Sequence, residues 1–232
     1  MAAEVSAQQE AKSPPSLADL HPSRLSNRSY ESVLEMILSG DLSGGSIIPE
    51  RRLAVLLGVS RTPLREALGR LEGEGYVARQ GRNMVVTSVT VQEVMEILEM
   101  RRLLECEAVR LATERLPPAA LAELRRALEE MSDPGATSDA DHRAVDDLLH
   151  LGIAEASGNR LLKRTIEDLR NKTRMFGLRR IPSRFEPGRA EHLEILEAME
   201  ARDAQRAHGL MHRHLENVKQ GILTAIMAGQ GS

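Results

Sequence analysis

Residues 50–73 constrain the fold of this 232-residue chain more than any other stretch. The apolar pattern predicts a short helix that ends at Gly58, a turn through Val59 and Ser60, and then a second, amphipathic helix. A helix, a glycine turn and a second helix in this order form a helix-turn-helix, which places its second helix in the major groove of DNA. Binding of double-stranded DNA is therefore the first hypothesis for this chain.

The second helix of this motif, predicted over 61–73, separates a buried face from a polar face. Its apolar residues follow the helical spacing i, i+3, i+4 and i+7, at Leu64, Ala67, Leu68 and Leu71. Arg61, Thr62 and Arg65 lie off this stripe, and an arginine there can bond guanine O6 and N7 or pair with phosphate. The alternative is that the two arginines form surface ion pairs with nearby glutamates.

Two short strands are predicted after this helix. The segments 76–79 and 84–87 are rich in residues that favour strands, and a Gln80-Gly81-Arg82-Asn83 turn separates them. A hairpin that follows a helix-turn-helix makes the module a winged helix-turn-helix.

Charge and composition limit the classes of partner and site. Residues 22–89 hold nine arginines and seven acidic residues, a net charge of +2, whereas residues 90–232 carry −3. A basic excess confined to one part of the chain fits a single module that meets phosphate. Aromatic residues make up 2% of the chain, which disfavours stacking on single-stranded nucleic acid. Cys106 is the only cysteine, which excludes an intramolecular disulfide and a multi-cysteine zinc site.

The expected fold is mainly α, in three parts. Residues 1–22 are expected to form a disordered arm, residues 23–89 a winged helix-turn-helix domain, and residues 90–232 an all-helical bundle that opens with a capping box from Thr90 to Glu93. Helices are predicted over about 28–39, 50–57, 61–73, 91–115, 118–131, 139–157, 160–179, 188–201 and 204–228, with breaks at Asp133-Pro134-Gly135, Ser157-Gly158-Asn159, Ile181-Pro182 and Glu186-Pro187-Gly188. There is no run of about 18 apolar residues and no apolar signal-peptide core, so we expect no membrane partner and a cytoplasmic location.

One carboxylate and three histidines in the helical part can form a metal site. Asp146 and His150 are spaced i, i+4 and project from one helix face, while His192 and His214 belong to two later predicted helices. Convergence of the four in a bundle core would suit Zn, Ni, Mn or Fe, with positions open for water or a ligand carboxylate. Spacing alone leaves the alternative that these histidines are structural, as most single histidines are.

Arg101 and Glu105 interrupt the apolar stripe of the long helix predicted from residue 91. Unpaired buried charge is costly, so each side chain needs a partner. One interpretation is an i, i+4 ion pair that braces the core. The other is that Arg101 faces a cavity and pairs with an anionic ligand.

The helix-turn-helix stretch resembles the winged helix of the GntR family of bacterial transcription regulators. The resemblance rests on Glu50, Leu53-Ala54, Gly58-Val59-Ser60-Arg61-Thr62-Pro63, Arg65-Glu66-Ala67-Leu68, Leu71 and Glu74-Gly75. It implies that Arg51, Arg61 and Arg65 contact DNA, with Thr62 beside them. The wing is slightly shorter than the usual pattern of the family, and Gly81 and Arg82 are its candidate contacts with the minor groove or with phosphate.

Residues 91–220 resemble the FCD effector domain of the FadR subfamily of these regulators. The matching order is Asp146-x3-His150, Ala156-Ser157-Gly158-Asn159, Glu191-His192 with Ile195-Leu196, and Asp203 with Ala207 before His214-Leu215. The resemblance implies that Asp146, His150, His192 and His214 bind a divalent metal, although some members of the subfamily lack one. It also implies a small organic acid as effector, with Arg101 facing it.

The expected function is a transcription regulator, and specifically a repressor that its effector releases from DNA. Operator binding as a homodimer is expected because a two-fold protein reads two half-sites. The helical domain is expected to bind the metal and the acid and to hold the dimer together. The main alternative is an enzyme whose metal activates water, but no general base, nucleophile elbow or phosphate loop accompanies the four ligands. A DNA-binding protein without an effector is the third possibility.

Overall fold

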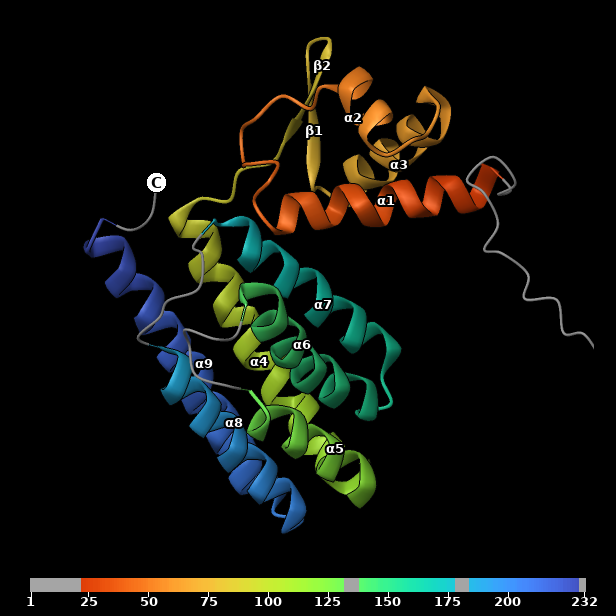
Figure 1. Ribbon diagram of the computed structural model, residues 1–232. Helices are drawn as coiled ribbons and strands as arrows, with labels where there is room; N and C mark the ends of the chain where they lie inside the picture. The colour runs from red at the N-terminus through yellow and green to blue at the C-terminus, as the bar shows by residue number, and fades with distance from the viewer. Residues whose placement is uncertain (1–21, 132–137, 178–183, 230–232) are drawn as a thin grey trace, which may run out of the picture. The chain divides into compact units, whose positions relative to one another are not determined.

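The computed structural model describes residues 22–131, 138–177 and 184–229, which divide into two compact units (Figure 1). The first unit takes in the described residues up to Met36 and Ile47–Val86, and the second takes in Ile37–Ser46 and the described residues from Thr87 onward. The arm expected over 1–22 lies outside the described residues except for Pro22. The breaks predicted at 133–135 and 181–182 lie outside them as well.

The first unit is a helix-turn-helix followed by a hairpin. It contains most of α1 (Pro22–Leu38), with α2 (Glu50–Leu56), α3 (Arg61–Gly73), β1 (Val77–Gln80) and β2 (Asn83–Val86). The strands pair antiparallel, from Val77 opposite Val86 to Gln80 opposite Asn83. Gly81 opens the two-residue turn between them with φ of 61°, a conformation that favours glycine. The predicted winged helix-turn-helix is confirmed.

The turn between α2 and α3 shows why a glycine stands in it. Gly58 has φ of 64°, and its N–H donates to the Val55 carbonyl at 3.2 Å while the Val59 N–H donates to the Ala54 carbonyl at 3.0 Å. These two bonds form a Schellman motif, which ends a helix with a residue in the left-handed region. Ser60 then takes an extended conformation and begins α3. The stripe predicted for α3 is buried at Leu64, Ala67, Leu68 and Leu71.

The first helix is longer than the sequence pattern predicted. α1 begins at Pro22 rather than at residue 28. Ser26 and Ser29 are only 6% and 1% exposed, so polar side chains occupy the buried face of its first turns and hide the apolar period. Proline is tolerated at the first helical position because the N–H it lacks would have no acceptor there.

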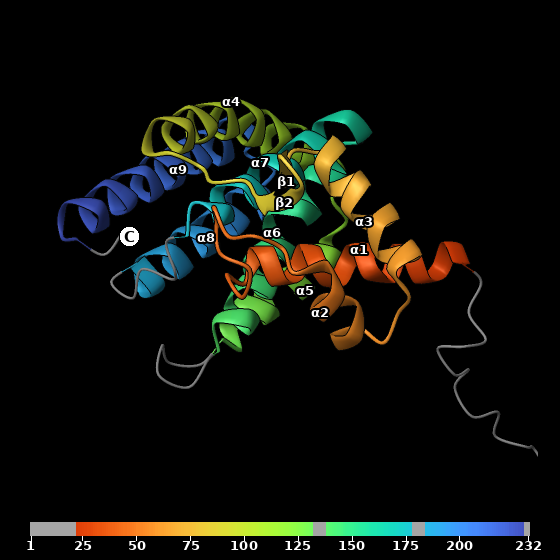
Figure 2. The same ribbon diagram turned by 90° about the horizontal axis from the view of Figure 1, so that it is seen from above.

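The second unit is an all-helical bundle in which α4 is central. Its helices are α4 (Val91–Arg115), α5 (Pro118–Glu129), α6 (Asp139–Ala156), α7 (Arg160–Met175), α8 (Phe185–Glu200) and α9 (Ala204–Met227). α4 packs against α6, α7, α8 and α9, and α9 runs along it in both views (Figures 1 and 2). Aliphatic side chains such as Val109, Leu149 and Ile195 fill the space between these helices. The mainly α fold is confirmed, and none of the described helices offers a stretch long and apolar enough to cross a bilayer.

Two caps fix where bundle helices begin. At the start of α4 the Glu93 N–H donates to the Thr90 hydroxyl at 3.2 Å, and the Thr90 N–H donates to the Glu93 carboxylate at 2.7 Å. This is the predicted capping box. At the start of α7 the Asn159 side-chain oxygen accepts from the N–H groups of Leu161 and Leu162, both at 3.1 Å. Both caps satisfy N–H groups that have no acceptor within the helix.

The prediction of a break at Glu186-Pro187-Gly188 was wrong. α8 begins at Phe185 and includes all three residues in its first turn. Pro187 is tolerated because the first N–H groups of a helix have no intrahelical acceptor, so a proline there costs no hydrogen bond. The Pro-Gly pair therefore lies inside the beginning of the helix that carries His192.

Cys106 is expected to resist thiol reagents while the protein is folded. The side chain is buried, and burial together with the charge of Glu105 raises the pKa of its thiol to about 12. The thiolate, which is the reactive form, is then scarce at pH 8. Iodoacetamide followed by mass spectrometry should find Cys106 unmodified in native protein and modified in guanidinium chloride. Rapid labelling of native protein would contradict this.

Candidate functional site

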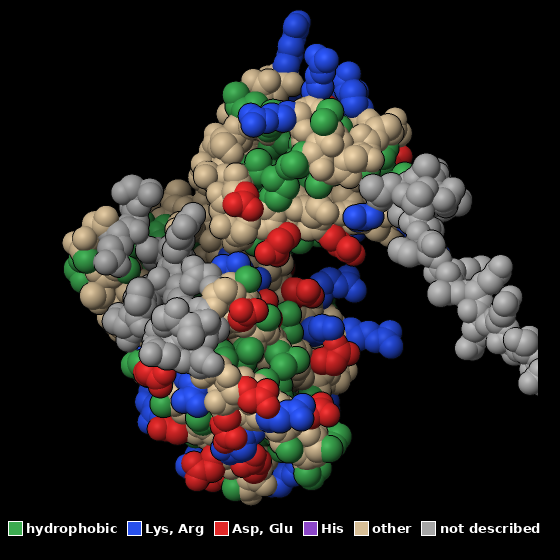
Figure 3. Space-filling view, viewed as in Figure 1, with side chains coloured by type: hydrophobic (Ala, Val, Ile, Leu, Met, Phe, Trp, Pro, Cys, Tyr) green, Lys and Arg blue, Asp and Glu red, His purple; other side chains and the backbone are tan. Residues whose placement is uncertain are grey.

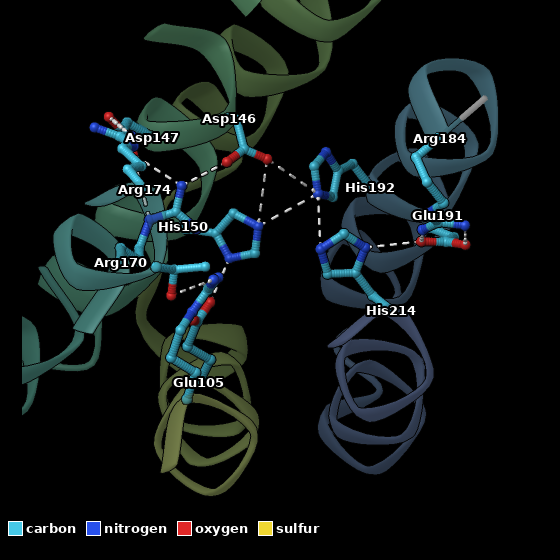
Figure 4. Close-up of polar contacts among 12 residues, drawn as sticks. Glu105, Asp146, Asp147, His150, Arg170, Arg174, Arg184, Glu191, His192 and His214 are labelled. Atoms are coloured by element: carbon cyan, nitrogen blue, oxygen red, sulfur yellow. Dashed lines mark hydrogen bonds and ion pairs between the residues drawn. The ribbon is translucent and has the colours of Figure 1, made fainter. Parts of the chain in front are cut away.

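Four side chains that the sequence singled out converge inside the second unit (Figure 4). Asp146 and His150 come from α6, His192 from α8 and His214 from α9, and the three histidines are buried. His192 Nε2 lies 3.3 Å from both His150 Nε2 and His214 Nε2. Asp146 Oδ1 lies 3.7 Å from the Nε2 atoms of His150 and His192. One oxygen and three nitrogens therefore face a common point.

Carboxylates behind two of the rings set which nitrogen faces that point. His150 Nδ1 donates to Glu105, and His214 Nδ1 donates to Glu191 at 2.8 Å. A neutral imidazole that donates from Nδ1 keeps a lone pair on Nε2. Arg184 and Asn217 also donate to Glu191, at 2.7 and 2.9 Å, and hold that carboxylate in place.

The donor set fits a metal ion. With lone pairs on Nε2 of both His150 and His214, a proton on His192 Nε2 can satisfy only one of them, because one N–H makes one good hydrogen bond. A shared cation satisfies all three nitrogens. Metal–nitrogen bonds of about 2.0–2.1 Å separate neighbouring ligand atoms by about 2.9–3.4 Å. The 3.3 Å spacings observed here lie within that range.

Burial and charge keep these groups in the protonation states that ligands require. Burial lowers the pKa of His150 and His192, and the charge of the nearby Arg170 guanidinium adds to this effect at both. Burial opposes ionisation of Asp146, but the Arg170 guanidinium outweighs it and lowers the pKa of that carboxyl. Neutral imidazoles beside an ionised carboxylate are the forms that bind divalent metals.

Arg170 positions the carboxylate ligand. Its guanidinium is buried and bonds Asp146 Oδ2 at 2.5 Å and Asp147 Oδ1 at 2.8 Å. Asp146 Oδ2 is thereby occupied, and Oδ1 is the oxygen that faces the histidines. Asp147 also pairs with Arg174. The neighbouring aspartates thus have different surroundings, and only Asp146 faces the candidate metal position (Figure 4).

Arg101 forms the ion pair of the first interpretation and also lines a cavity, while its pairing with an anionic ligand stays a prediction. Its Nε donates to Glu105 at 2.7 Å, and both side chains are buried. This is the bracing pair at i, i+4. Arg101 also lines a hollow in the second unit that reaches Asp146 and Arg170. The pair connects the hollow to the metal position, because Glu105 bonds Arg101 on one side and His150 on the other.

The sequence prediction missed three residues of this site. Glu105 was assigned to Arg101 alone, and Glu191 was noted only as the neighbour of His192. Arg170 was not noted at all, although it follows Leu162 and Ile166 at spacings of four and so falls on the buried stripe of α7. A charged residue on an apolar stripe was the signal that had picked out Arg101, and it would have found Arg170.

The six residues predicted to contact DNA all lie exposed on the first unit. Arg51 is on α2, Arg61, Thr62 and Arg65 are on α3, and Gly81 and Arg82 form the hairpin turn. Arg65 Nε donates to Glu50 at 2.9 Å, so this arginine does form a surface ion pair. Arginine side chains gather at the end of the unit that carries α2 and the hairpin turn (Figure 3). That end presents positive charge to a partner.

Comparisons with known proteins agree for both units. Residues 25–87 match the model for bacterial regulatory proteins of the gntR family, and residues 96–217 match the FCD domain. The chain is 30% identical to the uncharacterized HTH-type transcriptional regulator YdhC of Bacillus subtilis over 82% of this chain and 90% of that protein. It is 32% identical to the Glc operon transcriptional activator of Escherichia coli, over 60% of this chain and 63% of that protein.

A solved structure shares the fold over nearly the whole chain. McbR/YncC of Escherichia coli superposes with a TM-score of 0.77 at 25% identity, covering 90% of this chain and 99% of that one. Both curated relatives are named as transcriptional regulators and not as enzymes. The chain belongs to the GntR family of bacterial transcriptional regulators, with an N-terminal helix-turn-helix and a C-terminal FCD domain.

Proposed function

We propose that this chain is a repressor that binds operator DNA as a homodimer and leaves it when a small carboxylic acid binds beside a divalent metal in the helical domain. The observation that carries the proposal is the convergence of three Nε2 atoms and Asp146 Oδ1 on one point. A metal bound there supplies open coordination positions for a carboxylate oxygen. Asp146, His150, His192 and His214 would hold it, and Arg101 in the adjoining hollow would face the acid.

The proposed DNA contacts are those of the exposed face of the first unit. Arg61, Thr62 and Arg65 on α3 would meet base edges and phosphates in the major groove. Arg51 would bind phosphate, and Gly81 and Arg82 at the hairpin turn would lie at the minor groove or the backbone. Two copies are needed because one helix-turn-helix module reads one half-site of the operator. In the proposed division of the chain, residues 23–89 bind DNA and residues 90–232 bind the metal and the acid.

We propose repression rather than activation because a protein that occupies an operator can block transcription without contacting any other protein. The Escherichia coli relative that is named an activator shows that membership of the family does not fix this sign. Effector and operator must affect each other's affinity by the same factor, because the coupling between two sites is reciprocal. An acid that releases the protein from DNA therefore binds more weakly when DNA is present.

The experiment uses the full chain loaded with Zn²⁺ or Mn²⁺ and the DNA upstream of its own gene. Gel shifts would measure operator affinity across a panel of carboxylic acids, and a reporter strain lacking the protein would give the sign. We expect at least one acid to weaken DNA binding in a metal-dependent way, and expression to rise in the deletion strain. If no acid changes the affinity for DNA when the metal is present, the proposed effector response is refuted. If expression of the reporter falls in the deletion strain, the proposed repression is refuted.

A further inference from the structure

One of the arginines that line the hollow beside the candidate metal position has no carboxylate partner among the described residues. Five arginines line it, and four of them have carboxylate partners: Arg101 pairs with Glu105, Arg170 with Asp146 and Asp147, Arg174 with Asp147, and Arg184 with Glu191. Among the described lining residues, Arg143 is the arginine that has no such partner. It is half-buried, so water screens its charge only in part.

Arg143 stands on the same face of α6 as two proposed metal ligands. It precedes Asp146 by three residues and His150 by seven, and positions i, i+3 and i+7 of a helix share one face. Arg143 and Asp146 both line the hollow. Asp147, the carboxylate one turn along from Arg143, is already bonded by Arg170 and Arg174. The free guanidinium thus lies one helical turn from the metal position.

The part of the wall that α9 supplies is apolar. Val218, Ile222 and Ile226 line the hollow at spacings of four residues, so they form one apolar stripe along that helix. Phe176, which also lines the hollow, packs against the same cluster. The wall therefore offers one unpaired cation and one apolar strip.

We propose that Arg143 binds the carboxylate of the effector, and that the effector is a monocarboxylic acid with an apolar tail that lies along Val218, Ile222 and Ile226. This inference rests on the proposed function, since it names the class of acid that the sensor takes. An arginine fork binds a carboxylate through two parallel hydrogen bonds. A short hydroxy acid would leave the apolar strip uncovered, and a dicarboxylate would place its second charge against it.

The test uses the metal-loaded full chain and isothermal titration calorimetry with butanoate, hexanoate, octanoate and the neutral octanamide. A buried methylene contributes about 0.8 kcal/mol, which is roughly a fourfold gain in affinity for each added carbon. We expect that gain along the acid series and much weaker binding of octanamide. Succinate is titrated as the dicarboxylate comparison. Equal affinity of the three monocarboxylic acids, no binding of any acid, or tighter binding of succinate than of hexanoate would overturn the proposal.

Two variants test which side chains contact the carboxylate and the apolar tail of the ligand. Arg143→Gln should weaken octanoate binding at least tenfold without changing metal content, because Arg143 is not a ligand. Val218→Thr keeps the side-chain shape and should reduce the gain for each added carbon while short acids bind as before. The matched control is Arg126→Gln on α5, an arginine that is 71% exposed and does not line the hollow. Native affinity of Arg143→Gln for octanoate would overturn the assignment.

The same samples separate this inference from the function on which it rests. If octanoate binds through Arg143 but does not change the affinity for operator DNA, the proposed regulation by an acid is refuted, while the proposed class of ligand stands. Release of DNA by a different acid, with no effect of octanoate and no effect of Arg143→Gln, would keep the sensor and refute the ligand class.

Discussion

Arg65→Ala is expected to abolish specific binding to operator DNA and to leave the fold intact. Arg65 is 59% exposed on the polar face of α3, and its contact within the protein is a surface ion pair with Glu50. A bidentate arginine–guanine contact discriminates by about 1–3 kcal/mol, and the proposed homodimer would make the contact twice, so we expect a loss of roughly 2–6 kcal/mol of specific binding. Fluorescence anisotropy at fixed salt would show a loss of at least about 30-fold.

The ion pair supplies the matched control for this prediction. Glu50→Gln removes the pair with Arg65 but keeps the arginine. An exposed pair contributes about 0–1 kcal/mol to stability, so both variants should melt close to the native temperature. If Arg65 serves only to bind Glu50, the two variants will have the same affinity for DNA. We expect Glu50→Gln to bind at least as tightly as the native chain, because Arg65 is then free for DNA.

The first unit was predictable because its signals are local. α2 ends before Gly58 through two local hydrogen bonds, from the Gly58 N–H to Val55 and from the Val59 N–H to Ala54, and the stripe of α3 is visible in the spacing of its leucines. The start of α1 was missed because serines occupy its buried face, where a search for apolar period finds nothing. Local propensity and apolar spacing are visible in one sequence, whereas burial of a polar residue depends on the tertiary neighbours that cover it.

The candidate metal centre was only half visible in the sequence. Asp146 and His150 share a helix face, so their proximity follows from spacing, but His192 and His214 meet them only through packing of α8 and α9. The partners behind the ligands were hidden for the same reason. Glu105 lies 45 residues from His150, and nothing local says that this carboxylate bonds both Arg101 and an imidazole. Ligand types were therefore predictable, while the groups that orient them required the fold.

Those orienting groups also affect the stability of the second unit. Glu105, Asp146, Glu191 and Arg170 bring charge into a bundle that is otherwise filled by aliphatic side chains. Such charge is costly unless every group has a partner. Each carboxylate here has an arginine, and two of the three imidazoles donate from Nδ1 to a carboxylate. A cation among the Nε2 atoms would satisfy their lone pairs, so we expect metal binding to stabilise the second unit.

His192→Ala is therefore expected to remove the bound metal and to lower the melting temperature of the metal-loaded protein. His192 Nε2 lies between those of His150 and His214, so its loss opens the middle of the donor set. A ligand present at 1,000 times its Kd stabilises the folded state by about 4 kcal/mol, and a variant that cannot bind the ligand loses all of this stabilisation. In a chain of this size that corresponds to a fall of several degrees or more. Elemental analysis should give about one metal per native chain and almost none per variant chain.

A chelator separates loss of metal from simple damage to the core. It should lower the melting temperature of the native protein to near that of His192→Ala and should leave the variant unchanged, because the variant has no metal to lose. His212→Ala, an exposed histidine of α9 that contacts Arg102, is the matched control and should behave as native. Glu191→Gln should fall between them, since loss of a carboxylate behind a ligating imidazole costs about 10–100-fold in metal affinity. Full metal occupancy in His192→Ala would remove His192 from the site, and a chelator response in that variant equal to the native one would remove the link between metal and stability.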